Sequence, residues 1–84
     1  MSYTFVAKDD LRAHLLAAVV FCCRSAQHQG GDPQFVAGVL ALAECRAIGE
    51  GFDWPAILTD ARGALGRDVG KLIDTALLLE VDHA

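Results

Sequence analysis

The sequence predicts an all-α fold, a compact bundle of four helices that forms a single domain over residues 1–84. Apolar residues recur every three or four positions in four segments, and the breaks between them are short and carry glycine, aspartate or proline. Beyond the first few residues, no segment shows the alternating pattern of a strand. A chain of this length is too short to fill a second core, so one domain is expected.

The first helix is expected from Lys8 to Gln29, where Gly30 and Gly31 end the pattern. Aspartates in its first turn suit the positive end of the helix dipole. Residues 1–7 could form either an extended stub or an early helical turn, and the sequence does not decide between the two.

The second helix is expected to begin at Asp32 and Pro33 and to fade near Gly49 or Gly51. Aspartate caps helix N-termini, and proline is tolerated at the first helical position because its missing N–H has no partner there. Apolar or small residues surround this helix, in three strips: Phe35, Val39 and Leu42; Val36, Leu40, Ala43 and Ala47; and Ala37, Gly38, Ala41 and Cys45. We therefore expect it to be covered nearly all round, as the central element or as half of a symmetric dimer seam.

The third helix is expected to start after Asp53, which can cap it while Phe52 packs back on Ile57, and to end at Leu65. Its polar and apolar residues occupy opposite faces, as in an ordinary amphipathic helix.

Gly66 suits a left-handed helix C-cap, and Asp68 is the expected N-cap of a fourth helix over residues 69–81. The predicted core is contributed by all four helices: Leu15, Val19, Phe35, Val39, Leu42, Trp54, Ile57, Leu58, Leu65, Leu72, Ile73 and Leu77.

Two large apolar residues fall outside the predicted core faces. Phe21 lies opposite the apolar face of the first helix, and Leu78 falls among charged residues of the fourth, including Asp74 and Asp82. A single exposed apolar residue is ordinary. Together with the apolar second helix, however, these positions predict a protein-interaction surface that contains Phe21, Leu78, Asp74 and Asp82.

Charge, hydropathy and cysteine content limit which partners and which cellular location are expected. Seven basic residues against eleven acidic ones give a formal charge of -4, which disfavours nucleic acid and anionic membranes. The longest apolar run, residues 15–23, is far shorter than the roughly 20 residues of a membrane span. With no signal-peptide pattern and an odd number of cysteines, a cytoplasmic protein is expected, and the Ala, Gly, Val and Arg content suggests a bacterial or phage source.

No catalytic, cofactor or metal site is expected. Cys22 and Cys23 are adjacent on a helix and diverge by about 100°, so they do not form a metal-binding pair, and we interpret Cys22, Cys23 and Cys45 as small buried residues. His14 and His28 are expected to be solvated or locally hydrogen-bonded. The protein is therefore not expected to be an enzyme.

The sequence thus predicts a non-enzymatic protein-interaction module, an adaptor, regulator or inhibitor that binds another protein or itself as a homodimer. One alternative is a phage-encoded inhibitor of a bacterial defence protein, anti-CRISPR-like, that uses its acidic surface. A second is a helix-turn-helix nucleic-acid binder built from the last two helices. It is disfavoured because six acids oppose three bases from Asp53 onward.

Overall fold

The structure is a computed structural model that describes residues 8–82, and the question of how residues 1–7 are arranged lies outside this range. The described part of the chain holds helices and turns without a strand, which confirms the predicted all-α four-helix bundle. The helices are α1 (Lys8–His28), α2 (Pro33–Gly49), α3 (Trp54–Leu65) and α4 (Arg67–Asp82).

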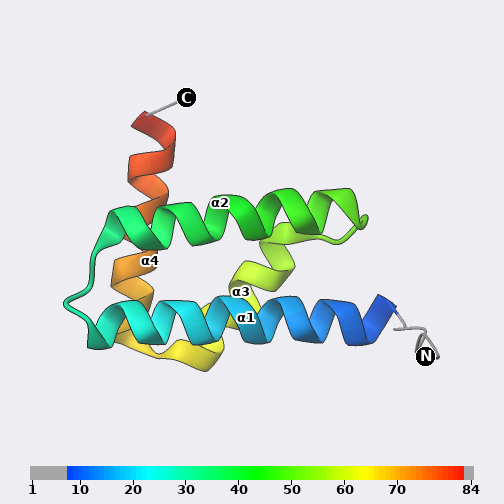
Figure 1. Cartoon of the computed structure of the whole chain (residues 1–84), viewed down its shortest axis with the longest axis horizontal. Helices are drawn as coiled ribbons and strands as arrows, with labels where there is room; N and C mark the ends of the chain where they lie inside the picture. The colour runs from blue at the N-terminus through cyan, green and yellow to red at the C-terminus, as the bar shows by residue number, and fades with distance from the viewer. Residues whose placement is uncertain (1–7, 83–84) are drawn as a thin grey trace, which may run out of the picture.

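The helices form two layers (Figure 1). Helices α1 and α2 lie side by side and antiparallel in one layer, and α3 and α4 cross behind them. Helix α4 packs mainly against α2, and α3 packs mainly against α1. The C-terminal half of α4 extends past α2 on the side away from α1.

Aspartate caps begin α2 and α3 as predicted. The backbone amide of Gln34 donates to Asp32 Oδ1 over 3.0 Å, and the amide of Ala56 donates to Asp53 Oδ1 over 3.4 Å. A proline in the first turn follows each cap. Both helix starts therefore follow from local chemistry alone.

The connection between α3 and α4 is tighter than predicted. Gly66 alone links them, with a φ of 86° and a ψ of 179°, so it lies outside the left-handed helical region that was expected. Its amide donates to the Arg62 carbonyl, and its carbonyl accepts from the amide of Gly70 over 3.0 Å. Gly66 therefore ends α3 and also closes the first turn of α4. The prediction that Asp68 caps α4 is wrong, because the helix already begins at Arg67.

The core lies where the two layers meet and contains no buried polar side chain among the described residues. Four of the predicted core residues, Leu15, Leu58, Leu65 and Leu77, are partly buried and pack against its edge. The buried hydrophobic residues are Val19, Cys23, Ala26, Val36, Leu40, Ala43, Ala47, Trp54, Ile57, Ala61, Val69, Leu72, Ile73 and Ala76.

Helix α2 turns a different strip inward from the one predicted. Phe35 and Leu42, both expected in the core, are 52% and 74% exposed, and Val39 is half-buried. The buried residues of α2 are Val36, Leu40, Ala43 and Ala47. The small side chains of the two alanines let neighbouring helices approach α2 closely, whereas the bulkier strip would hold them away. Within a single chain α2 is therefore covered on one side only, so the expectation that it is the central element is wrong, and the expectation of a symmetric dimer seam stays a prediction.

Candidate protein-binding surface

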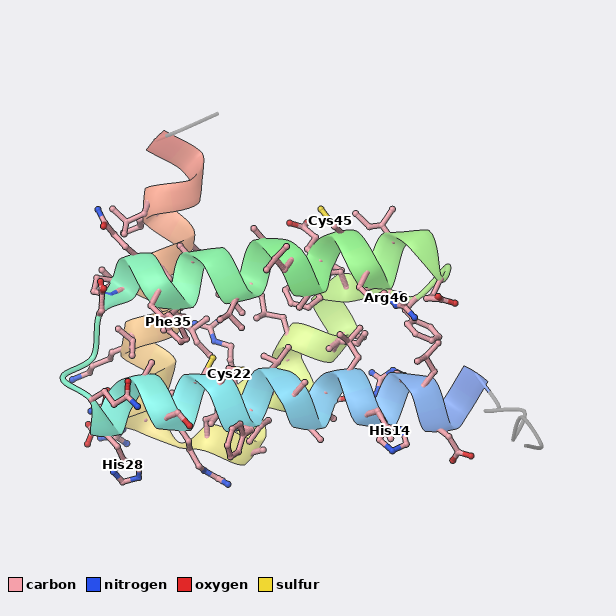
Figure 2. The ribbon with its side chains drawn as sticks, viewed as in Figure 1. His14, Cys22, His28, Phe35, Cys45 and Arg46 are labelled. Atoms are coloured by element: carbon pink, nitrogen blue, oxygen red, sulfur yellow. The ribbon has the colours of Figure 1, made fainter. Side chains whose placement is uncertain are left out.

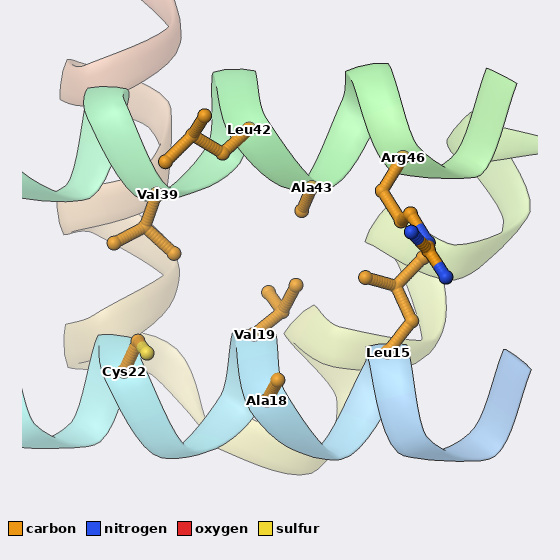
Figure 3. Close-up of a pocket in the computed structure, with 8 residues that line it drawn as sticks. All are labelled: Leu15, Ala18, Val19, Cys22, Val39, Leu42, Ala43 and Arg46. Atoms are coloured by element: carbon orange, nitrogen blue, oxygen red, sulfur yellow. The ribbon is translucent and has the colours of Figure 1, made fainter. Parts of the chain in front are cut away.

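An apolar groove runs between α1 and α2 (Figure 3). It is shallow and open to solvent, with a volume of about 280 Å³, and α3 and α4 lie behind it. The lining residues are Leu15, Ala18, Val19 and Cys22 from α1, and Val39, Leu42, Ala43 and Arg46 from α2. Arg46 is the one charged residue among them, so the groove suits an apolar group with a polar neighbour at one end.

One edge of the groove belongs to a row of residues on α2 that we call the outer stripe: Phe35, Val39, Leu42 and Arg46. These residues follow one another at spacings of four, three and four positions, so they share one side of the helix. The Arg46 side chain is 60% exposed and lies 3.4 Å from a carboxylate oxygen of Glu50, one turn later. The outer stripe is therefore apolar along its length and cationic at its C-terminal end.

The opposite end of the outer stripe meets a second, smaller hollow of about 190 Å³ near the α1–α2 turn. Phe35 lines this hollow together with Asp32, Gln29 and Ala26, and Figure 2 shows Phe35 on the side of α2 that faces α1. The N-terminal end of the outer stripe thus carries an aromatic ring with a carboxylate beside it.

The structure does not join the predicted interaction residues into one surface. Phe21 and Leu78 are exposed as expected, at 71% and 66%. Phe21 lies on α1, whereas Leu78 lies on the half of α4 that extends past α2 on the side away from α1. Asp74 forms an ion pair with Arg62 of α3, and the Asp82 side chain lies outside the described part of the structure.

The groove and the outer stripe were visible in the sequence only as one of three apolar strips on α2. The helical pattern could not show which strip faces inward, because all three are apolar or small. Ile48, which is 64% exposed near the C-terminal end of α2, belongs to none of the three strips and lies outside this surface.

The three cysteines occupy different environments. Cys23 is buried as predicted, Cys22 is half-buried on the groove, and the prediction of burial is wrong for Cys45, which is exposed on the side of α2 away from α1 (Figure 2). Burial, with a smaller contribution from Cys22, raises the pKa of Cys23 from 9.0 to about 11. This thiol therefore stays protonated near neutral pH and is a poor nucleophile.

Both histidines of α1 are exposed, as expected, on the side away from α2 (Figure 2). His14 Nδ1 lies 2.8 Å from the carbonyl oxygen of Asp10, a local hydrogen bond in which the ring N–H donates. Among the side chains that the structure describes, no three from His, Cys, Asp or Glu come together in a group that could hold a metal ion.

The alternative function of a helix-turn-helix nucleic-acid binder would depend on α3, α4 and the connection between them. A single residue connects them, whereas that motif uses a turn of about three or four residues. On α4, the exposed bases Arg67 and Lys71 are interspersed with the exposed acids Asp68 and Asp74. This mixture of charges gives no continuous basic surface on the described part of α4.

None of the helices over residues 8–82 combines the length and the apolar character that crossing a membrane requires. Comparison with known protein families, with curated proteins and with solved structures finds no match to this chain. The α1–α2 groove and the outer stripe are therefore interpreted from their own geometry.

Proposed function

We propose that the chain is a small, non-enzymatic protein-interaction module whose contact surface is the α1–α2 groove together with the outer stripe of α2. The observation that carries the proposal is Leu42, which is 74% exposed at the edge of an apolar groove of about 280 Å³. Covering a leucine side chain contributes roughly 1.5–3 kcal/mol. Contiguous apolar patches of this kind mark protein contact sites more often than single exposed residues do.

The layout of this surface favours a helix as the bound element. The antiparallel helices α1 and α2 form the two sides of the groove. Its apolar floor is made by Val19 and Ala43, which are 1% and 7% exposed. Amphipathic helices bind in such grooves through apolar residues spaced three and four positions apart. Polar groups at the two ends, Arg46 and Asp32, supply the rim that orients a partner.

The anti-CRISPR-like inhibitor would instead bind a basic protein through acids such as Asp74. That carboxylate is already held by Arg62, so its contribution to a partner is reduced. The apolar groove therefore supports the interaction module more directly than the acidic surface supports this alternative. Free thiols at Cys22, Cys23 and Cys45 are compatible with the reducing cytoplasm in which we place the protein.

A capture experiment tests the proposal with two matched variants on the same helix. Leu42→Glu places a charge on the groove, and Ile48→Glu places one at a similarly exposed position that lies roughly 120° or more around α2 from each residue of the outer stripe. The tagged chain and both variants are incubated in lysate from the source cell, and bound proteins, including untagged copies of the chain, are identified by mass spectrometry.

We expect at least one bound protein to be lost with Leu42→Glu and kept with Ile48→Glu, while circular dichroism shows all chains to be equally helical. Proteins that bind regardless of Leu42→Glu would contradict the proposed surface. Phe21→Glu and Leu78→Glu, run in parallel, test the contact residues predicted from the sequence, and binding lost only with these variants would place the surface there instead.

A further inference from the structure

We infer that the occupant of the groove is a second copy of this chain, whose α2 runs antiparallel to the first across a two-fold axis. The inference rests on the proposed function, because it names the partner of the same surface. It is carried by the symmetry of the outer stripe, by the charges at its two ends and by the size of the α1–α2 face.

The outer stripe has the same spacing in both directions. Phe35, Val39, Leu42 and Arg46 are separated by four, three and four residues, so the outer pair and the inner pair share one midpoint, between residues 40 and 41. A two-fold axis at this midpoint places Val39 opposite the second copy's Leu42, and Phe35 opposite the second copy's Arg46. Alternating spacings of three and four are those of a helix seam in which side chains interlock.

The pairs that this axis creates are chemically complementary. At the centre, valine meets leucine twice, and both side chains are at least partly exposed in the single chain. At each end, the guanidinium of Arg46 meets the ring of Phe35, a favourable contact of a cation with an aromatic face. Asp32, three residues before Phe35, adds a carboxylate near that guanidinium. A parallel pairing would instead bring like charges together at each end.

The charge of the chain also favours this face for self-association. Two copies of a chain with a formal charge of -4 repel each other, so they associate best through the surface that carries the fewest acids. The outer stripe itself contains no acid, and the two acids beside its ends, Asp32 and Glu50, both lie where the axis places an Arg46 guanidinium. The exposed Asp60 and Asp74 belong to α3 and α4 in the other layer.

The α1–α2 layer has enough area for a stable contact. Its two helices have 21 and 17 residues, so they are about 31 and 25 Å long, and each is about 10 Å wide with its side chains. A standard protein interface buries about 800 Å² on each partner, which this face can supply. The small side chains of Ala18 and Cys22 on α1 leave space beside α2 for the second copy's Leu42 (Figure 3).

The first test is the molar mass of the purified full chain over a range of concentrations, by size-exclusion chromatography with light scattering. We expect a mass of twice 8.9 kDa that falls toward the monomer on dilution. Leu42→Glu is expected to be monomeric throughout, and Ile48→Glu to behave as the unchanged chain. A native chain that is monomeric at every concentration would overturn the second copy as occupant. The proposed function would then still stand if a bound lysate protein is lost with Leu42→Glu.

The second test addresses the antiparallel register. Leu42→Glu and Val39→Lys each place two unpaired charges in a symmetric dimer, so each variant alone is expected to be monomeric. Mixed in equal amounts, they are expected to form a dimer with one copy of each, detected by native mass spectrometry, because the new carboxylate faces the new amine. The other half of that seam keeps its native valine and leucine.

A mixture that stays monomeric while the unchanged chain dimerises would overturn this register. In a parallel seam the two introduced charges would not face each other. Val39 is half-buried, so circular dichroism accompanies the test. If Val39→Lys loses helicity, the more exposed pair Arg46→Glu and Phe35→Lys is mixed instead, with the same expected recovery of the dimer at the ends of the seam.

Discussion

Helices α2 and α3 use their apolar residues in different ways. In α3 the buried residues Trp54, Ile57 and Ala61 make up most of the apolar face, and the outer side carries polar residues such as Thr59 and Asp60. In α2, by contrast, the exposed side also carries large apolar residues, those of the outer stripe, in addition to the buried strip. The fold of a single chain accounts for the composition of α3 but leaves apolar surface on α2 uncovered. That excess locates the candidate contact surface.

The largest expected effect is on the free energy of unfolding, and it distinguishes the buried strip of α2 from the outer stripe. Leu40 is 1% exposed and Leu42 is 74% exposed, although the two lie two residues apart. Leu40→Ala is expected to lower the free energy of unfolding by about 2–5 kcal/mol, because it removes buried methyl groups and leaves a cavity. Leu42→Ala is expected to change it by less than about 0.5 kcal/mol in the monomer. Urea denaturation of dilute protein, followed by circular dichroism, measures both.

Repeating that denaturation at high protein concentration sharpens the comparison. In a dimer that buries the outer stripe, Leu42→Ala becomes destabilising while the loss caused by Leu40→Ala stays nearly constant. Equal losses for the two variants in dilute solution would contradict the division of α2 into a buried strip and an outer stripe.

Most of the fold could be predicted because its signals are local. Asp32 and Asp53, each with a proline one or two residues later, determine where α2 and α3 begin. The paired glycines end α1 one residue before the predicted boundary. The start of α4 was misplaced because Asp68 also suits the first turn of a helix, where its charge favours the positive end of the dipole.

The sequence indicated α2 as a possible dimer seam, but it could not predict which strip of α2 faces outward, because this depends on how the helices pack. Phe35 and Leu42 look like core residues in any local pattern, and only the close approach of α1 and α4 to the alanine-containing strip turns them outward. By contrast, Phe21 was correctly expected to be exposed, because the opposite side of α1 is plainly the more apolar one. An amphipathic helix reveals its orientation, and a helix that is apolar all round does not.

The buried thiol of Cys23 on α1 gives a comparison of a buried with an exposed position that depends on pH. Burial raises the pKa of Cys23 from 9.0 to about 11, so between these values the unfolded chain loses a proton that the folded chain keeps. The free energy of unfolding is therefore expected to fall as the pH rises through this window, by roughly 2–3 kcal/mol in all. Denaturation at a series of pH values measures the loss.

Cys23→Ala is expected to remove this part of the alkaline loss, whereas Cys45→Ala, at an exposed position, keeps it. Comparing the variants cancels the ionisation of other groups in the same pH range. An unchanged pH dependence in Cys23→Ala would show that burial of this thiol does not couple ionisation to folding.

Removing the N-cap aspartates tests whether α2 and α3 are stabilised equally at their N-termini, although their outer faces differ. Asp53→Ala removes an acceptor for the Ala56 amide, and Asp32→Ala removes one for the Gln34 amide. Each is expected to cost about 1 kcal/mol of stability, whereas replacement by asparagine, which also caps, is expected to cost little. Thermal denaturation compares the four variants. Asparagine variants as unstable as the alanine variants would contradict a capping role.

The smallest expected effect concerns the polar outer face of α3. Arg12 Nη2 of α1 donates to Asp60 Oδ2 over 2.8 Å, with the two side chains 33% and 51% exposed. A double-mutant cycle with Arg12→Ala and Asp60→Ala is expected to give a coupling of about 0.2–1 kcal/mol, weakened at high salt, because exposed ion pairs are well solvated. Urea denaturation in low and high salt measures it.

A pair on α2 serves as the reference for this coupling. Arg46 and Glu50 are 3.4 Å apart at neighbouring turns of α2, so in dilute, monomeric protein a cycle on them reports a local pair worth about 0.2–0.5 kcal/mol, whereas Arg12 and Asp60 join two helices. If the outer face of α3 helps to hold it on α1, the coupling of Arg12 with Asp60 equals or exceeds that reference. A coupling near zero would mean that this ion pair does not help to hold α3 on α1, and the contrast with α2 would then concern only which residues are exposed.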